Sequence, residues 1–122
     1  MAPLPSRLKI KAQLMAGDEI AIGPGKAALL EAIAQTGSIT AAARTMGLSY
    51  RRAWLMLDTM NRCFASPLVA TAHGGAKGGG AQLTPAGAAA LAAFRALEAG
   101  LADAARAHER ALLSALAPPS KP

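Results

Sequence analysis

The chain has 122 residues, and its 13 lysines and arginines against 7 acids give a formal net charge of +6 and a pI near 10.3. This length suits a single domain with a modest core, and the positive charge predicts an anionic partner, of which nucleic acid is the commonest. A membrane partner is disfavoured because no apolar run reaches the roughly 20 residues of a spanning helix. The N-terminus is also not organised like a signal peptide, so we expect a cytoplasmic protein.

The N-terminal part predicts a β-hairpin. Residues 1–7 are expected to be flexible, and a turn at Gly17-Asp18 separates residues 8–14 from a second short strand over 19–22. Residues 8–14 alternate with the period of a half-buried strand, and the apolar face of this strand consists of Leu8, Ile10, Ala12 and Leu14.

Three helices are expected after this hairpin. The first covers residues 26–36 and ends at Gly37, in the position where a left-handed residue commonly stops a helix. Ser38 is a good N-cap for a second helix over 39–46, which ends at Gly47. Ser49 caps a third helix from residue 50 to about 64.

A second hairpin and a long helix complete the chain. Residues 68–73 and 81–83 are predicted strands joined by the glycine-rich stretch 74–80, and Thr84-Pro85 is typical of a helix start. The fold class is therefore mainly α with small β-hairpins: a winged helix-turn-helix domain over 8–84, a long dimerisation helix over 85–116, and a disordered tail over 117–122.

The segment from Ile39 to Leu57 carries the main functional prediction. A helix-turn-helix needs small or apolar residues where its helices touch, and Ala43 and Gly47 stand four apart at the turn. From residue 36 to residue 80 there are five basic residues against one acid. A helical projection of residues 50–64 separates an apolar face from a face with Arg51 and Arg62, as a helix in the major groove requires.

These patterns predict a set of DNA-contacting residues. The third helix would present its arginines to bases or phosphates, and the glycine-rich hairpin would follow the DNA backbone. Tyr50 and Trp54 either pack over the edge of the core or contact the DNA backbone. The alternative for the arginines is a solvated basic face without a DNA contact. The alternative for His73 is an ordinary surface position. The predicted residues are Ser38, Thr40, Arg44, Ser49, Tyr50, Arg51, Arg52, Trp54, Arg62, His73 and Lys77.

The last helix carries an apolar stripe at steps of three or four residues. A second copy of the chain would cover this stripe in a homodimer. The alternative is packing on the body of the same chain, and the two arrangements are compatible if they apply to different halves of the helix. The stripe consists of Leu91, Phe94, Leu97, Leu101, Ala105, His108, Leu112 and Leu116.

Catalytic, metal and cofactor sites are not expected. The chain has two isolated histidines, one cysteine and scattered carboxylates, which supply neither a nucleophile with its base nor ligands at metal spacing. Cys63 lies in an apolar helical stretch and is expected to be a reduced core thiol.

Several motifs together resemble one family. Thr36-Gly37-Ser38-Ile39, Ser49-Tyr50-Arg51-Arg52-Ala53-Trp54, Met60-Asn61, the glycines of 74–80 and Leu83-Thr84-Pro85-Ala86-Gly87 are similar to the DNA-binding domain of ModE, the molybdate-responsive regulator, and to the LysR-type winged helix. The resemblance spans roughly residues 8–110. It implies a homodimer on an inverted-repeat operator, with residues 49–52 near the major groove, and a link to molybdate uptake or molybdoenzyme genes.

The resemblance also leaves alternatives open. The molybdate-binding domains of the family are not present in these 122 residues, so we expect a stand-alone DNA-binding member without a ligand of its own. A chromosome-associated protein indifferent to sequence, or a winged-helix module for an unidentified protein partner, are the competing functions. Arginines on the third helix disfavour the protein module, whereas basic residues elsewhere in the chain keep the chromosome-associated reading open.

Overall fold

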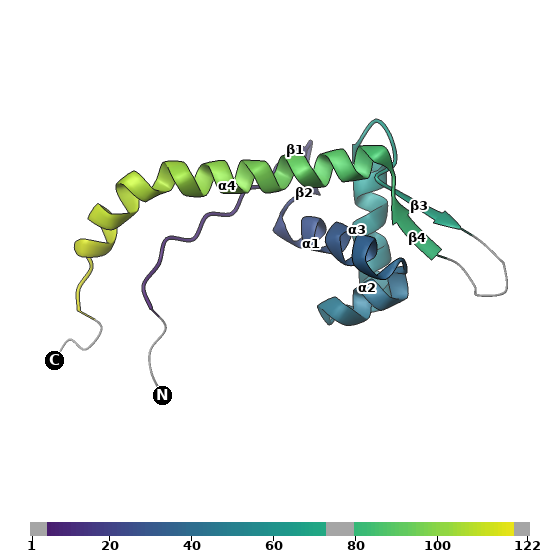
Figure 1. The fold of residues 1–122 in the computed structure, drawn as a ribbon, viewed down its shortest axis with the longest axis horizontal. Helices are drawn as coiled ribbons and strands as arrows, with labels where there is room; N and C mark the ends of the chain where they lie inside the picture. The colour runs from purple at the N-terminus through teal and green to yellow at the C-terminus, as the bar shows by residue number, and fades with distance from the viewer. Residues whose placement is uncertain (1–4, 73–79, 119–122) are drawn as a thin grey trace.

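A computed structural model describes residues 5–72 and 80–118 of the chain. Its elements form a hairpin, three helices, a second hairpin and a long helix, which confirms the predicted fold class (Figure 1). They are β1 (Leu14–Ala16), β2 (Glu19–Ile22), α1 (Pro24–Thr36), α2 (Ile39–Met46), α3 (Tyr50–Cys63), β3 (Val69–Ala72), β4 (Gly80–Leu83) and α4 (Pro85–Ser114).

The N-terminal hairpin is shorter than predicted. β1 pairs antiparallel with β2 from Leu14 opposite Ile22 to Ala16 opposite Glu19, and Gly17 makes the turn with a φ of 62°. The strand predicted from residue 8 is wrong for residues 8–13, because the four-residue β2 pairs only with β1 and offers them no partner. These residues run beside α4 instead (Figure 1).

The predicted caps fix the ends of the short helices. Ser38 Oγ accepts a hydrogen bond from Ala41 N at 3.1 Å, and Ser49 Oγ accepts one from Arg52 N at 3.0 Å. Gly37 and Gly47 end α1 and α2 in the left-handed conformation, with φ of 72° and 69°. These residues set α2 and α3 as two short, sharply bounded helices joined by a tight turn.

One hydrophobic core joins the three short helices to both hairpins and to the start of α4. Six large side chains are almost completely inaccessible: Leu29, Leu30, Ile33, Leu57, Met60 and Leu68. The predicted apolar face of α3 is confirmed, since Ala53, Leu57 and Met60 are buried, and Met56 and Phe64 pack against the core from half-buried positions. On the opposite face of α3, Arg51 and Leu55 are exposed.

The junction between the second hairpin and α4 depends on a close backbone approach. Thr84 N donates to the Leu68 carbonyl at 3.0 Å, and Thr84 Oγ1 donates to the Pro67 carbonyl at 2.6 Å and caps α4 by accepting from Gly87 N. A Cβ at position 87 would lie 1.9 Å from the Leu68 carbonyl oxygen, so only glycine fits there. This contact explains the Leu83-Thr84-Pro85-Ala86-Gly87 motif.

The long helix α4 continues beyond the body formed by α1, α2, α3 and the hairpins (Figure 1). Near the body, Arg95 forms ion pairs with Glu31 of α1 and with Glu98. The hydrogen bonds that its guanidinium donates to the two carboxylates raise the pKa of Arg95, and the bond to Glu98 has the larger effect. Within residues 5–72 and 80–118, no helix combines the length and the hydropathy needed to cross a bilayer.

Candidate DNA interface

The N-terminal end of α3 presents exposed positive charge. Arg51 and Arg52 follow directly on the Ser49 cap, and Arg44 lies in the last turn of α2. Among the described residues, no carboxylate lies within 4.0 Å of these three guanidinium groups. Their charge is therefore available to an external anion.

Tyr50 and Trp54 lie one turn apart on the exposed side of α3. Trp54 Nε1 donates a hydrogen bond to Tyr50 Oη at 2.8 Å, and the two side chains are 38% and 51% exposed respectively. Neither is a member of the buried core, and both line a hollow beside the core residues Ile39 and Ala81. Since Tyr50 Oη accepts the indole proton, its own hydroxyl proton remains free to be donated.

A shallow hollow of about 230 Å³ lies between the N-terminal ends of α2 and α3 and the strands of the second hairpin. It brings together four predicted DNA contacts, Ser38, Thr40, Tyr50 and Trp54, with Thr71 of β3. Its side-chain hydroxyls offer several hydrogen-bond donors to one ligand, a composition that suits a phosphate group better than an apolar ligand.

The hairpin β3–β4 forms the wing and is held against the helices by backbone groups. Ala81 N donates to the carbonyl of Gly37 at 2.9 Å, which ties β4 to the end of α1. Asn61 Oδ1 accepts a hydrogen bond from Leu68 N at 2.8 Å, which links the residue before β3 to α3. Sequence reasoning gave Asn61 no role, although it stands in the Met60-Asn61 motif. The predicted contacts His73 and Lys77 lie outside the described residues.

Arg62 makes contacts within the chain that the sequence did not predict. Its Nη1 and Nη2 donate to the two carboxylate oxygens of Glu19 at 2.9 Å each, and its Nε donates to Asp58 at 2.9 Å. The hydrogen bond with Arg62 lowers the pKa of Glu19, and the two carboxylates raise the pKa of Arg62. Because its guanidinium already binds two anions, we leave Arg62 out of the proposed contact set.

The apolar stripe of α4 divides into three parts. Leu91 and Phe94 pack in the chain's own core, where Phe94 is 4% exposed, so we assign both to the fold rather than to a partner. Leu101 and Ala105 are half-buried beside residues 8–12. The members that remain on the surface are Leu97, His108, Leu112 and Leu116.

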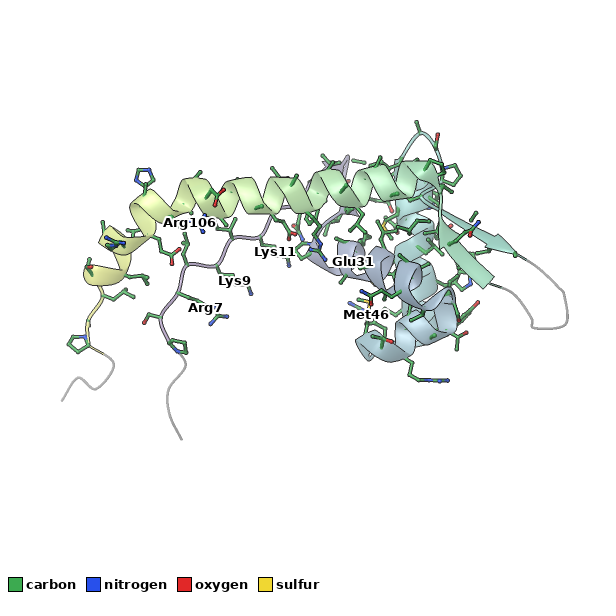
Figure 2. All side chains as sticks on the ribbon, in the orientation of Figure 1. Arg7, Lys9, Lys11, Glu31, Met46 and Arg106 are labelled. Carbon is green, nitrogen blue, oxygen red and sulfur yellow. The ribbon has the colours of Figure 1, made fainter. Side chains whose placement is uncertain are left out.

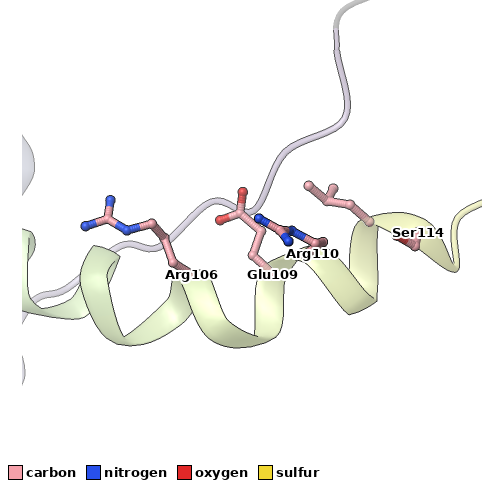
Figure 3. A pocket seen from close by; sticks show the side chains of 5 residues that line it. Arg106, Glu109, Arg110 and Ser114 are labelled. Carbon is pink, nitrogen blue, oxygen red and sulfur yellow. The ribbon is translucent and has the colours of Figure 1, made fainter.

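Other candidate ligand sites are weak. Among the residues described, no three His, Cys, Asp or Glu side chains gather as a metal site would require. A further hollow on the C-terminal half of α4 is lined by Arg106, Glu109, Arg110, Leu113 and Ser114 (Figure 3). It is open and its charges are mixed, so the surface formed by α2, α3 and the wing is the best candidate.

Known proteins have sequences similar to this chain. Residues 26–88 match the family described as bacterial regulatory helix-turn-helix protein, lysR family. The chain belongs to this family. Membership in a family of regulatory proteins confirms the expectation that the chain is not an enzyme.

Three relatives confirm the resemblance to ModE. MopB of Rhodobacter capsulatus, named a molybdenum-pterin-binding protein, is 50% identical over 91 residues, or 75% of this chain and 34% of that protein. ModE of Azotobacter vinelandii, a molybdenum transport protein, is 51% identical over 70 residues, or 57% of this chain and 26% of that protein. The DNA-binding transcriptional dual regulator ModE of Escherichia coli is 44% identical over 61 residues, or 50% of this chain and 23% of that protein. The chain thus spans about a third or less of the length of these relatives.

Proposed function

We propose that the chain is a homodimeric regulator of transcription that binds a preferred double-stranded DNA sequence through α3, and that its target genes serve molybdenum transport or molybdoenzymes. The observation that carries this proposal is the pair of exposed guanidinium groups at the start of α3, Arg51 and Arg52, without a carboxylate partner in the described chain.

The geometry beside these arginines supports a duplex as the ligand. A helix that enters the major groove reads base edges with residues near its N-terminus, while neighbouring elements contact phosphates. Arg51 and Arg52 occupy that end of α3, and the hydroxyl-lined hollow lies between it and the wing. We therefore assign the arginines to the groove, and Ser38, Thr40 and Tyr50 to the adjoining backbone.

The exposed end of α4 supports the homodimer. Leu112 of α4 is 61% exposed, and Leu116, two residues beyond the end of α4, is 55% exposed, so two large apolar side chains lie on the surface at this end of the helix. A second copy of the same helix would remove them from water, and a dimer would place two α3 helices on an inverted repeat.

The link to molybdenum rests on relatives. ModE of A. vinelandii is named a molybdenum transport protein, and MopB of R. capsulatus a molybdenum-pterin-binding protein. The match with MopB covers 91 of the 122 residues, which is long enough to include α2 and α3, so we propose that the chain acts on the same class of genes.

Selection of bound duplexes from a random-sequence library tests the proposal. We expect an enriched inverted repeat, and we expect Arg51→Ala to weaken binding to that sequence by about 1–3 kcal/mol, the range for one good contact to a base. Arg110→Ala, which removes a charge from the far end of α4, is the matched control and should retain the preference. A library that yields no enriched sequence would contradict sequence-specific regulation.

A further inference from the structure

We propose that residues 5–13, named the arm here, form a second DNA-binding element that contacts the phosphate backbone beside the site read by α3. This inference rests on the proposed DNA-binding function and adds a contact surface that none of the predicted site residues includes. Three features of the arm carry it: the way it is seated on α4, its charge, and its position relative to α1, α2 and α3.

The apolar side chains of the arm seat it on α4. Leu8, Ile10 and Ala12 line one hollow of about 420 Å³ together with residues of α4 that include Leu101 and Ala105. Leu8 also lines a second hollow with Leu112 and Leu116. The alternating pattern that predicted a strand thus belongs to an extended segment that lies on a helix. Every second side chain of this segment is directed toward α4.

The other side of the arm is a row of positive charge. Arg7, Lys9 and Lys11 occupy alternate positions, are exposed, and share the arm with no acidic residue. No carboxylate of the described chain lies within 4.0 Å of them. Figure 2 shows all three side chains projecting away from α4. Arg7 also lines the hollow beside Leu8, at the start of the row.

The position and spacing of this row fit DNA better than a compact anion. The arm lies on the same side of α4 as α1, α2 and α3, so its charges face the space beside the helix-turn-helix unit (Figure 2). Alternate residues of an extended chain are about 6.6 Å apart, and the phosphates of one DNA strand recur every 3.4 Å along the duplex axis. Because the strand also winds around this axis, successive phosphates lie farther apart than the rise, at a distance of the same order as the spacing of the row.

A salt titration of DNA binding tests the arm. The variant Arg7→Gln/Lys9→Gln/Lys11→Gln is compared with Arg7→Lys/Lys9→Arg/Lys11→Arg, which changes the same positions and keeps their charge. Each phosphate contact contributes about 0.9 to the slope of log affinity against log salt, so we expect the glutamine variant to lose about 2.7 in slope per protomer. Between 50 and 200 mM salt this equals a difference of roughly 40-fold in the salt-induced loss of affinity.

The same titration is run on the enriched duplex and on an unrelated duplex of equal length. We expect an equal change on both, since phosphate contacts carry no sequence information, and a wild-type slope for the charge-conserving variant. An unchanged slope overturns the proposal, as does a change confined to the enriched duplex. An altered sedimentation mass of the glutamine variant without DNA also overturns it, in favour of a role in self-association.

The two proposals fail in different ways. If the wild-type protein binds duplexes without preference, the regulatory function fails while the slope still reports on the arm. If the wild-type protein selects an inverted repeat and the glutamine variant matches its slope, only the arm proposal fails. Urea unfolding of each variant checks that these exposed substitutions leave the fold intact.

Discussion

At the scale of single residues, the candidate interface depends on which polar groups are already occupied. Arg62 uses its guanidinium on Glu19 and Asp58, whereas Arg51 and Arg52 have no carboxylate partner in the described chain. Trp54 uses its indole proton on Tyr50, which leaves the tyrosine hydroxyl with a proton to donate. Polar side chains of the same helix thus differ in whether their hydrogen-bond donors are available to DNA.

Tyr50→Phe tests this reading of the Tyr50 hydroxyl. On the proposed function the variant loses a hydrogen bond to a phosphate, and we expect weaker binding, by about 1–3 kcal/mol, to enriched and unrelated duplexes alike. Because the side chain is half exposed, its free energy of unfolding should change by no more than about 0.5 kcal/mol.

Fluorescence anisotropy with labelled duplexes and urea unfolding give the two quantities. Trp54→Phe is the control, since it removes the indole donor and leaves the tyrosine hydroxyl in place, and it should cost less affinity. Wild-type affinity for Tyr50→Phe would remove Tyr50 from the proposed contacts.

At the scale of elements, two glycines of α4 have opposite roles. A Cβ at Gly87 would meet the Leu68 carbonyl oxygen at 1.9 Å, whereas a Cβ at Gly100 meets nothing within 4 Å. We expect Gly87→Ala to lower the free energy of unfolding by about 1–3 kcal/mol through overpacking. Gly100→Ala should raise it by about 0.5–1 kcal/mol, because alanine favours a helix interior. Urea titrations of both variants measure the difference, and equal values would contradict the close approach.

The contact between the first hairpin and α3 predicts a dependence of stability on pH. The hydrogen bond from Arg62 holds the pKa of Glu19 below its usual 4.5 in the folded protein, so the unfolded chain binds the proton more readily. The contribution of Glu19 is therefore present above pH 4.5 and is lost as the pH falls through the lower, folded pKa. We expect the wild type to exceed Glu19→Gln in urea midpoint at pH 7, and the gap to be smaller at pH 3.

Glu109→Gln is a suitable control for this pH experiment. It removes a carboxylate from α4 that takes part in no ion pair of the described chain. Its urea midpoint should follow that of the wild type at both pH values. A gap for Glu19→Gln as wide at pH 3 as at pH 7 would contradict a contribution from the charge of Glu19.

Local sequence signals predicted the elements well where a cap or a turn fixed them. Ser38, Ser49 and Thr84 each cap the helix that they were expected to start, and Gly37 and Gly47 end helices in the left-handed conformation. Capping chemistry acts over three or four residues, so a reader of the sequence finds both partners of each bond within one turn.

Contacts between distant parts of the chain were harder to foresee. Glu19 and Arg62 are 43 residues apart, and nothing local marks them as partners. The alternation over residues 8–14 indicated which side chains share a face but not what that face meets, because a strand and a segment lying on a helix have the same period. The predicted site residues therefore include Arg62, which contacts Glu19 and Asp58, and none of residues 5–13.

At the scale of the whole molecule, α4 divides between the core of its own chain and an exposed surface. Its first part buries Phe94, and its C-terminal half leaves Leu112 61% exposed. On the proposed homodimer, Leu112→Gln should lower the fraction of dimer in sedimentation equilibrium without DNA, because it removes apolar area from the interface.

Leu55→Gln is the matched control for self-association. Leu55 is 55% exposed and lies on α3, away from the proposed dimer surface. This variant should keep the mass of the wild type at every concentration. An equal loss of mass in both variants would point to general exposure of apolar side chains rather than to a surface on α4.

The direct contact of Gly87 with the Leu68 carbonyl has a consequence for how the molecule can vary. No side chain separates the base of the wing from the first turn of α4, and hydrogen bonds from Thr84 lock the same junction. The direction in which the long helix leaves the domain is thus set by main-chain atoms. Substitutions along its outer turns can change what the helix binds while its angle to the wing stays constant.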